Sequence, residues 1–322
     1  MAERIGVLTS GGDAPGMNAA IRAVVRAGIY YGYEIYGIQS GYNGLIEGEF
    51  QPMNLRSVSD IMSRGGTILK TSRSKLFETP EGRARAIENL KSLDINSLVV
   101  IGGDGSYRGA RELSRESSMN VVGIPGTIDN DIGCTDYTIG YDTALNTVRD
   151  CIDRIKDTAF SHDRCSIIEV MGHHAGYIAL NSAIAGGAEA CILPEKPFDL
   201  ERDIIHPLVA CRARGKKLFL IIVSEGAYPS YKLAGEIQER MDITPTVSIL
   251  GYIQRGGSPT VRDRLMASLM GVRAVDAVRN GERNVVVASR AGEIVTIGIN
   301  EALEMKKEIS PDRFVANSIL SL

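Results

Sequence analysis

Short apolar stretches that end in glycine-rich loops, and then give way to helical spacing, recur along this chain. The stretch Ile5–Thr9 is followed by the loop Ser10–Gly16, and the stretch 98–101 is followed by the glycine run that starts at Gly102. A buried strand that opens through a glycine loop into a helix is the repeating unit of a parallel α/β sheet. Ligands of such sheets bind at the carboxyl ends of the strands, so function is expected in these loops.

The length and composition allow two lobes and exclude several classes of protein. The chain has 322 residues, 44% of them hydrophobic and 23% charged, and its net charge of −3 gives no general case for nucleic acid or an anionic membrane as partner. No apolar run approaches the ~20 residues of a membrane span. The five scattered cysteines are interpreted as small buried hydrophobes. Without a leader sequence ahead of the first strand, a cytoplasmic location is expected.

The remaining apolar patterns continue the alternation of strand and helix. Strands are predicted over 34–38, 98–101, 121–124, 166–170, 218–223 and 246–250, and helices from Met17, over 81–92, around Ala110 and Leu113, over 143–156 and after Gly176. Regular alternation predicts parallel sheets with helices on both faces. No low-complexity linker divides the chain, so two halves are expected to share an extended cleft.

Two loops carry a phosphate-binding pattern. Three glycines in 102–106 would let phosphates approach the backbone, and Asp104 among them is suited to a divalent metal. The loop Ser10–Gly16 has glycines at the start of a helix, which fits a polyphosphate or simply a tight turn. It is not a Walker loop, because no Gly-Lys-Ser/Thr follows. Similar glycine-acid-glycine runs occur in several kinds of kinase, so this run alone does not name a substrate.

A third loop adds a hydroxyl and two carboxylates. Thr127, Asp129 and Asp131 occupy alternate positions after the strand at 121–124. Along an extended segment, alternate side chains point to one side, so the three are expected to face a common site. An acid beside an acceptor hydroxyl can take its proton. A phosphate cradle next to a general base indicates phosphoryl transfer, while a plain Asp-Asn-Asp turn is the alternative.

Over nearly its whole length the chain resembles the bacterial ATP-dependent phosphofructokinases. The resemblance rests on Ile5–Asp13, Gly102–Tyr107, Pro125–Asp131, Val170–Gly172 and Gln254–Pro259, which stand in the order and spacing of that family. It implies an α/β fold of two Rossmann-like three-layer α/β/α lobes, with mainly parallel sheets and an active-site cleft between them. It implies transfer of the γ-phosphoryl of ATP to the 1-hydroxyl of fructose 6-phosphate, with Mg²⁺, and a homotetramer.

The resemblance also assigns lobes and residues. The ATP-binding lobe would comprise 1–140 and about 258–304, and the sugar-phosphate lobe 141–257 and 305–322. Asp129 would be the proton acceptor, Thr127 and Asp131 would be further catalytic residues, and Asp104 would be the Mg²⁺ ligand. Nucleotide contacts would come from Gly12, Arg73, Ser74, Gly103, Asp104, Gly105 and Ser106. Sugar-phosphate contacts would come from Thr127, Asp129, Arg164, Met171, Gly172, His173, Glu225, Tyr252 and Arg255. Relatives that use pyrophosphate carry an acid at Gly105 and a lysine at Gly126, so glycine at both positions favours ATP.

Three departures from the family pattern concern the sugar phosphate. His173, Thr246 and Tyr252 stand where the family has arginine, arginine and histidine, which grip anionic groups. Hydrogen bonds to charged groups contribute ~1.5–3 kcal/mol each. The open alternatives are compensation by neighbouring groups and a paralogue that is weak on fructose 6-phosphate or acts on another phosphorylated sugar. A non-catalytic relative fits less well, because Asp104 and Asp129 are intact. A two-lobed periplasmic-type sugar-binding protein fits less well, because the chain has glycine-acid phosphate loops and no leader is expected.

The resemblance also implies an effector site between subunits, where ADP activates and phosphoenolpyruvate inhibits. Its residues would be Arg22, Arg26, Lys156, Gly187, Glu189, Arg214 and Lys216. Leu55 stands where many relatives have a further basic residue, so regulation is expected to be weaker or different. The alternative is that these basic residues form an ordinary solvated surface.

Overall fold

The structure, a computed structural model, describes residues 3–161 and 165–321 and divides them into two compact units. Unit 1 contains the chain up to Ile128, Ile132–Thr143 and Arg255–Lys307. Unit 2 contains Asp129–Asp131, Ala144–Gln254 and the chain from Glu308 onward. No helix among the described residues is both long and apolar enough to cross a membrane.

Unit 1 is built on a seven-stranded sheet in the order β11-β10-β5-β4-β1-β2-β3. Its strands are β1 (Arg4–Thr9), β2 (Glu34–Ile38), β3 (Phe50–Met53), β4 (Ile95–Gly102), β5 (Asn120–Pro125), β10 (Val285–Arg290) and β11 (Glu293–Gly298). The five inner strands are parallel, and the edge strands β3 and β11 pair antiparallel with β2 and β10. β4 is buried from Ser97 to its end, as expected for a parallel strand covered on both faces.

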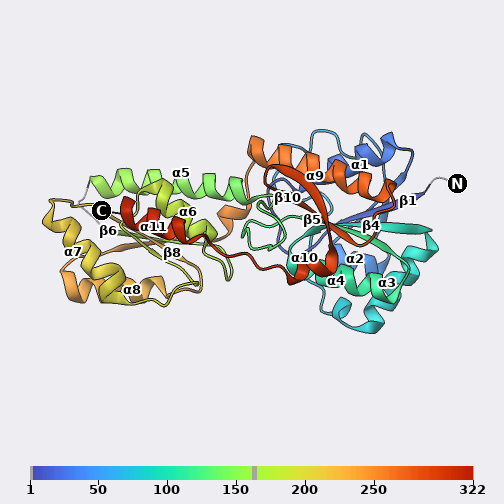
Figure 1. Ribbon diagram of the computed structural model, residues 1–322. Coiled ribbons are helices and arrows are strands. Elements are labelled where there is room, and N and C mark those ends of the chain that lie inside the picture. The colour runs from blue at the N-terminus through green and yellow to red at the C-terminus, as the bar shows by residue number, and fades with distance from the viewer. Residues whose placement is uncertain (1–2, 162–164, 322) are drawn as a thin grey trace. The chain divides into compact units, whose positions relative to one another are not determined.

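Helices cover both faces of this sheet. They are α1 (Met17–Tyr30), α2 (Gly41–Glu47), η1 (Leu76–Glu78), α3 (Pro80–Ser92), α4 (Asp104–Glu116), α9 (Val261–Arg279) and α10 (Ile299–Glu304). Helices α1 and α9 pack together on one face, and α2, α3, α4 and α10 lie on the other (Figure 1). Unit 1 is therefore a three-layer α/β/α sandwich.

Unit 2 has a four-stranded parallel sheet in the order β7-β8-β6-β9. The strands are β6 (Cys165–Val170), β7 (Ala190–Ile192), β8 (Phe219–Ser224) and β9 (Thr246–Ile249). The helical segments are α5 (Tyr141–Phe160), α6 (Tyr177–Gly186), η2 (Glu201–Ile205), α7 (His206–Ala213), α8 (Ser230–Met241), η3 (Gly251–Arg255) and α11 (Pro311–Leu320). The first three residues of α5 and the last residue of η3 belong to unit 1. Helices α5, α6 and α11 lie on one face of the sheet and α7 and α8 on the other (Figure 1).

The elements predicted from apolar patterns are confirmed within a few residues of their predicted ends, and so are the mainly parallel sheets. The helix predicted over 81–92 begins at Pro80, because Thr79 caps it by accepting a hydrogen bond from the Gly82 amide. Burial also raises the pKa of the Cys134 thiol to about 11 and that of Cys165 to about 12, as expected for cysteines that act as small hydrophobes.

Candidate active site

The three predicted loops begin at the ends of neighbouring parallel strands of unit 1. Strand β4 lies between β1 and β5, and their registers align Thr9 with Ile101 and Gly102 with Pro125. The Ser10 amide donates to the Ile101 carbonyl at 2.9 Å, and the Gly126 amide donates to the Gly102 carbonyl at 3.0 Å. The sheet therefore places the three loops side by side at one edge, as their predicted positions required.

The second loop leaves open space where α4 begins. A Cβ at Gly103 or at Gly105 would meet no atom within 4 Å, whereas a Cβ at Gly102 would stand 2.5 Å from the Ser10 carbonyl oxygen and from Ser106 Oγ. Gly103 is the extended N-cap of α4, so the amides of Asp104 and Gly105 have no partner within the helix, whereas the Ser106 amide donates to the Gly103 carbonyl at 3.0 Å. Accessible amides at the positive end of a helix dipole are suited to phosphate.

Asp104 stands in the first turn of this helix. Its half-exposed carboxylate accepts a hydrogen bond from Arg108 Nε at 2.8 Å, one turn further along. Among the described residues, no three His, Cys, Asp or Glu side chains gather to hold a metal. A single accessible carboxylate fits Mg²⁺, which keeps several waters and takes its other ligands from substrate phosphates.

A segment that the sequence did not assign to the site supports the first loop. Thr71 Oγ1 donates to the Gly11 carbonyl at 2.8 Å, and Thr9 Oγ1 donates to the Lys70 carbonyl at 2.7 Å. These bonds hold the chain beside the loop just before Arg73, whose side chain is exposed, and Ser74, whose Oγ accepts from the Phe77 amide. The predicted nucleotide contacts at 73 and 74 thus follow a segment that is bonded to the first loop.

Gly12 and Arg255 share one space in unit 1. The Arg255 guanidinium donates to the Asp13 carbonyl at 3.1 Å, and a Cβ at Gly12 would stand 2.3 Å from its Nη1. Arg255 was expected to contact the sugar phosphate. In this structure its guanidinium lies against the loop Ser10–Gly16, so its positive charge is available beside that loop. The role at the sugar phosphate stays a prediction.

The expected alternation of Thr127, Asp129 and Asp131 is wrong in one respect. Thr127 and Asp129 are each 8% exposed, but Asp131 is exposed. The reason lies between the two acids: Asn130 has a left-handed backbone (φ 52°), so the segment does not stay extended. Asp131 therefore does not share the burial of the other two side chains. Its catalytic role remains a prediction without that geometric support.

In unit 2, Glu225 organises the loop after β6. Val170 and Ser224 are neighbours in the β6–β8 register, and Glu225 Oε1 accepts from the amides of Gly172 (3.1 Å) and His173 (2.8 Å). Gln254 Oε1 accepts from the Met171 amide at 3.1 Å. The predicted sugar-phosphate residues Met171, Gly172 and Glu225 are thus brought together. Gln254 was not predicted among the site residues, although it opens the Gln-Arg-Gly-Gly motif.

The three departures lie at exposed positions. His173 has a left-handed backbone (φ 55°), and its ring centroid is 3.9 Å from that of His174. Tyr252 is 83% exposed. Thr246 is on the edge strand β9, and its Oγ1 lies 3.3 Å from Ser166 Oγ. Arg164, a further predicted contact, lies outside the described residues.

The predicted effector residues of unit 2 gather where α6 ends and β8 begins. Lys156 Nζ donates to the Gly186 carbonyl at 3.0 Å, and the buried Glu189 forms an ion pair with Lys216 and accepts from the Leu220 amide at 2.6 Å. Gly187 takes a left-handed backbone after α6. Arg22 and Arg26 lie on α1 in unit 1.

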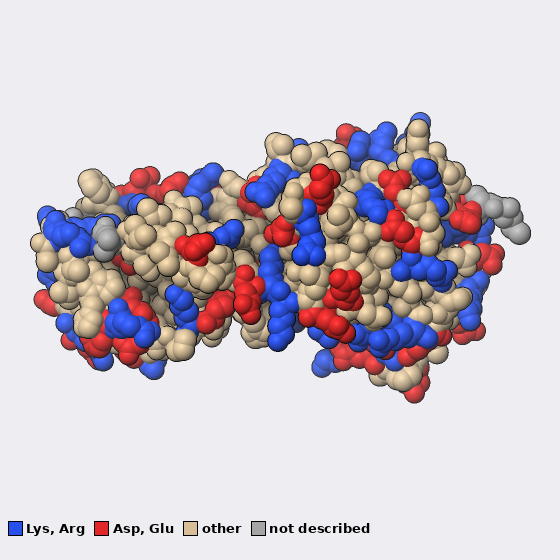
Figure 2. Space-filling model, in the orientation of Figure 1, with Lys and Arg blue, Asp and Glu red and all other residues tan. Residues whose placement is uncertain are grey.

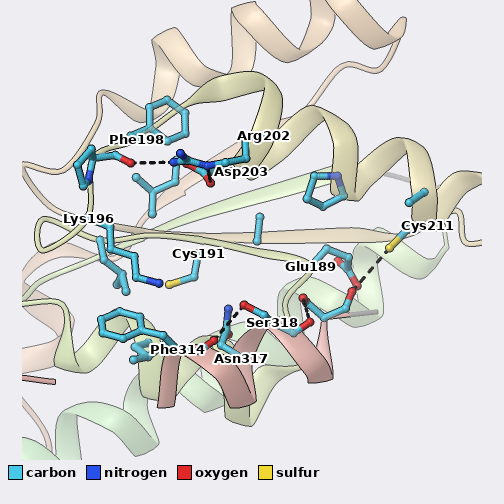
Figure 3. A pocket seen from close by; sticks show the side chains of 18 of the residues that line it. Glu189, Cys191, Lys196, Phe198, Arg202, Asp203, Cys211, Phe314, Asn317 and Ser318 are labelled. Atoms are coloured by element: carbon cyan, nitrogen blue, oxygen red, sulfur yellow. Dashed lines mark hydrogen bonds and ion pairs between the residues drawn. The ribbon is translucent and has the colours of Figure 1, made fainter. Parts of the chain in front are cut away.

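Glu189 and Arg214 also line a cavity of about 580 Å³ in unit 2 (Figure 3). Its walls come from the segment 189–198, from α7 and from α11, and Lys196 Nζ lies 3.8 Å from the ring centroid of Phe314 across it. The wall formed by α11 was not predicted, because no sequence motif marks that helix. Figure 2 shows charges of both signs interspersed over one face of the molecule, as the small net charge predicts.

The comparisons with known proteins agree with the resemblance. The phosphofructokinase family model matches residues 4–278. The chain is 53% identical over 319 residues to the ATP-dependent 6-phosphofructokinase of Thermoanaerobacter sp. (strain X514), with 99% of each chain covered. It is 51% identical over 322 residues to ATP-dependent 6-phosphofructokinase 1 of Thermus thermophilus, covering 99% of this chain and 100% of that one.

Solved structures give the same result. The phosphofructokinase of Saccharomyces cerevisiae superposes with a TM-score of 0.89 at 34% identity, over 99% of this chain and 48% of that one. A pyrophosphate-dependent phosphofructokinase from Marinobacter aquaeolei, with a TM-score of 0.84 at 21% identity over 99% of this chain and 91% of that one, shares the fold. This chain belongs to the phosphofructokinase family.

Proposed function

We propose that this protein transfers the γ-phosphoryl group of ATP to the 1-hydroxyl of fructose 6-phosphate, giving fructose 1,6-bisphosphate and ADP. The observation that carries the proposal is the alignment of three loops at the ends of β1, β4 and β5, with open backbone at Gly103 and Gly105. The names of relatives with about half of their residues in common support ATP as donor and fructose 6-phosphate as acceptor. Unit 1 would bind ATP and unit 2 the sugar phosphate.

In this mechanism backbone amides bind the phosphates, and side chains hold the metal ion and accept the proton of the attacking hydroxyl. The amides at the start of α4 and the Gly11–Asp13 loop receive the polyphosphate. Asp104 would hold Mg²⁺, which neutralises charge on the phosphates. Asp129 accepts the proton of the attacking hydroxyl, and Thr127, two residues before it, bonds the transferring group. General-base catalysis of this kind contributes about 10²–10⁴ in rate.

The donor and the acceptor are tested separately. Purified protein is supplied with ATP or pyrophosphate, each with a panel of phosphorylated sugars, and the phosphorylated product is quantified. We expect turnover with ATP and fructose 6-phosphate at a kcat/KM above that of every other pair. A higher kcat/KM with another sugar phosphate would reject fructose 6-phosphate as the acceptor. It would also give His173, Thr246 and Tyr252 a role in specificity.

We also propose regulation and self-association, which the family resemblance implied. The cluster around Glu189 would bind ADP or phosphoenolpyruvate, and copies of the chain would form a homotetramer in the cytoplasm. An exposed apolar stripe on α9, formed by Val261, Leu265, Leu269 and Val272, supports self-association. Sedimentation velocity tests the tetramer. Saturation curves for fructose 6-phosphate with and without ADP test the effector, and unchanged curves would reject it.

A further inference from the structure

The carboxylate of Asp263, in unit 1 and outside the predicted site, accepts four hydrogen bonds. Asp263 is fully buried. Oδ1 accepts from the Tyr137 hydroxyl at 2.5 Å and from the Gly140 amide at 2.7 Å. Oδ2 accepts from the amide and the hydroxyl of Thr143 at 2.8 and 2.5 Å. A buried carboxylate is costly unless such donors surround it, so these bonds strongly determine the path of the 137–143 segment.

Helix capping does not explain this arrangement. Asp263 is the third residue of α9, and Thr260 caps that helix by accepting from the Asp263 amide. In a capping box the acid would turn back to the amide of the cap residue. Here the Thr260 amide donates to Thr143 Oγ1 at 3.0 Å instead, and the Asp263 carboxylate faces the 137–143 segment.

The anchored segment is wedged between two loops of the site. On one side, a Cβ at Gly140 would stand 2.7 Å from Ala14 Cβ, and a Cβ at Gly16 would stand 2.6 Å from Ile139 Cγ2. On the other side, the Ile139 amide donates to the Pro125 carbonyl at 2.8 Å, and Ile139 forms a parallel bridge with Gly126. Thr127 directly follows Gly126 in the chain. The segment therefore sets the spacing between the nucleotide loop and the loop that carries Thr127.

We propose that Asp263 is a positioning residue: through the 137–143 segment it holds Thr127 at a fixed distance and orientation from the nucleotide loop Ser10–Gly16. This role rests on the proposed phosphoryl transfer and adds a residue to it. Thr127, the loop Ser10–Gly16, the 137–143 segment and Asp263 all belong to unit 1. A displacement of about 1 Å in such a site can cost about 10²-fold in rate without weakening substrate binding.

The test is a double-mutant cycle on the single-turnover rate of phosphoryl transfer. Asp263→Asn keeps the shape of the side chain. Its NH₂ group would face N–H and O–H groups that now donate hydrogen bonds to the carboxylate, so a donor would meet donors. We expect the rate at saturating substrates to fall about 10- to 100-fold. The Michaelis constants for ATP and fructose 6-phosphate should stay within about threefold of the wild-type values. In a Thr127→Ala background, the same change should lower the rate by less than about threefold, because its target is already missing.

The control separates positioning from lost stability. Glu282 is also bonded to partners in unit 1, Arg273 and Thr296, and lies outside the predicted site. Glu282→Gln should lower the melting temperature and leave the single-turnover rate unchanged. If Asp263→Asn does not fold, Tyr137→Phe removes one donor to Asp263 and should lower the rate about two- to fivefold, again only when Thr127 is present.

Three results would overturn the role of Asp263. They are an unchanged rate in folded Asp263→Asn or in Tyr137→Phe, an equal loss with and without Thr127, and a rise in Michaelis constants with no fall in rate. The proposed function is judged by the wild-type protein alone. A wild-type chain that does not phosphorylate fructose 6-phosphate rejects that function, whereas an active wild type with additive mutants rejects only the positioning role.

Discussion

The guanidinium of Arg255 occupies the space that a side chain at Gly12 would need, and it donates a hydrogen bond to the Asp13 carbonyl. Residues far apart in the sequence thus lie against each other at the loop Ser10–Gly16. The Gln-Arg-Gly-Gly motif and the first glycine loop, which the sequence presents as separate features, are in contact. A substitution at Gly12 tests whether the two motifs act together.

Replacing Gly12→Ala should weaken ATP binding and leave the fold intact. The added Cβ would displace the flexible end of Arg255 rather than backbone, so the melting temperature should change little. We expect the Michaelis constant for ATP to rise about tenfold, equivalent to ~1.4 kcal/mol. Gly235→Ala is the matched control, because a Cβ there meets open space in α8. An ATP constant unchanged in Gly12→Ala would show that Arg255 has no part in nucleotide binding.

Asp129→Ser should abolish most turnover while nucleotide binding persists. The carboxylate is the proposed proton acceptor, and a serine hydroxyl is far too weak a base to replace it. We expect kcat to fall by about 10²–10⁴. Nucleotide affinity, measured by calorimetry on the same sample, should stay within about threefold of wild type. Retention of more than a tenth of the wild-type kcat would exclude Asp129 as the general base.

Glu225→Ala should act on the sugar phosphate and spare ATP. The change removes the acceptor of the Gly172 and His173 amides, and with it the bond that holds the left-handed backbone of His173. We expect the Michaelis constant for the sugar phosphate to rise about tenfold or more, since bonds to charged groups contribute ~1.5–3 kcal/mol. Glu236→Ala, which removes the acceptor of the Tyr228 hydroxyl in unit 2, should leave both constants unchanged. A rise confined to ATP would contradict the assignment of this loop.

The ion pair between Arg83 and Glu116 should make stability depend on pH in a predictable direction. Hydrogen bonding to Arg83 lowers the pKa of Glu116 below its ordinary value of 4.5. A carboxyl with a lowered folded-state pKa stabilises the fold above its unfolded pKa and loses that contribution as pH falls through the folded pKa. Glu116→Gln should therefore cost about 0.5–1 kcal/mol at pH 7 and nothing below its folded-state pKa.

Denaturant unfolding at several pH values measures this difference. Glu239 is exposed, and its Oε2 lies as far as 4.0 Å from Arg240 Nη1. Glu239→Gln should therefore show no comparable change. A cost for Glu116→Gln that stays constant as the pH is lowered from neutrality to below the folded-state pKa would mean that packing, and not charge, accounts for it.

The apolar pattern by itself determined the order of strands and helices and the loops that carry chemistry. A run such as Leu98–Ile101 can be buried on both faces only in a parallel sheet, and glycines at its end leave backbone amides accessible. The hairpin between β10 and β11 was not predicted. Its turn has positive φ at Ala291 and Gly292, and Ala-Gly is a weak signal for that turn.

Tertiary structure alone decided which distant residues support the loops. Nothing local in the sequence shows that Asp263 serves the 137–143 segment rather than its own helix, that Arg255 lies over Gly12, or that a left-handed Asn130 separates the exposed Asp131 from the buried Thr127 and Asp129. Periodicity reports which face of an element is buried. The partner of a buried polar group depends on which elements pack together, and that is settled only when the chain has folded.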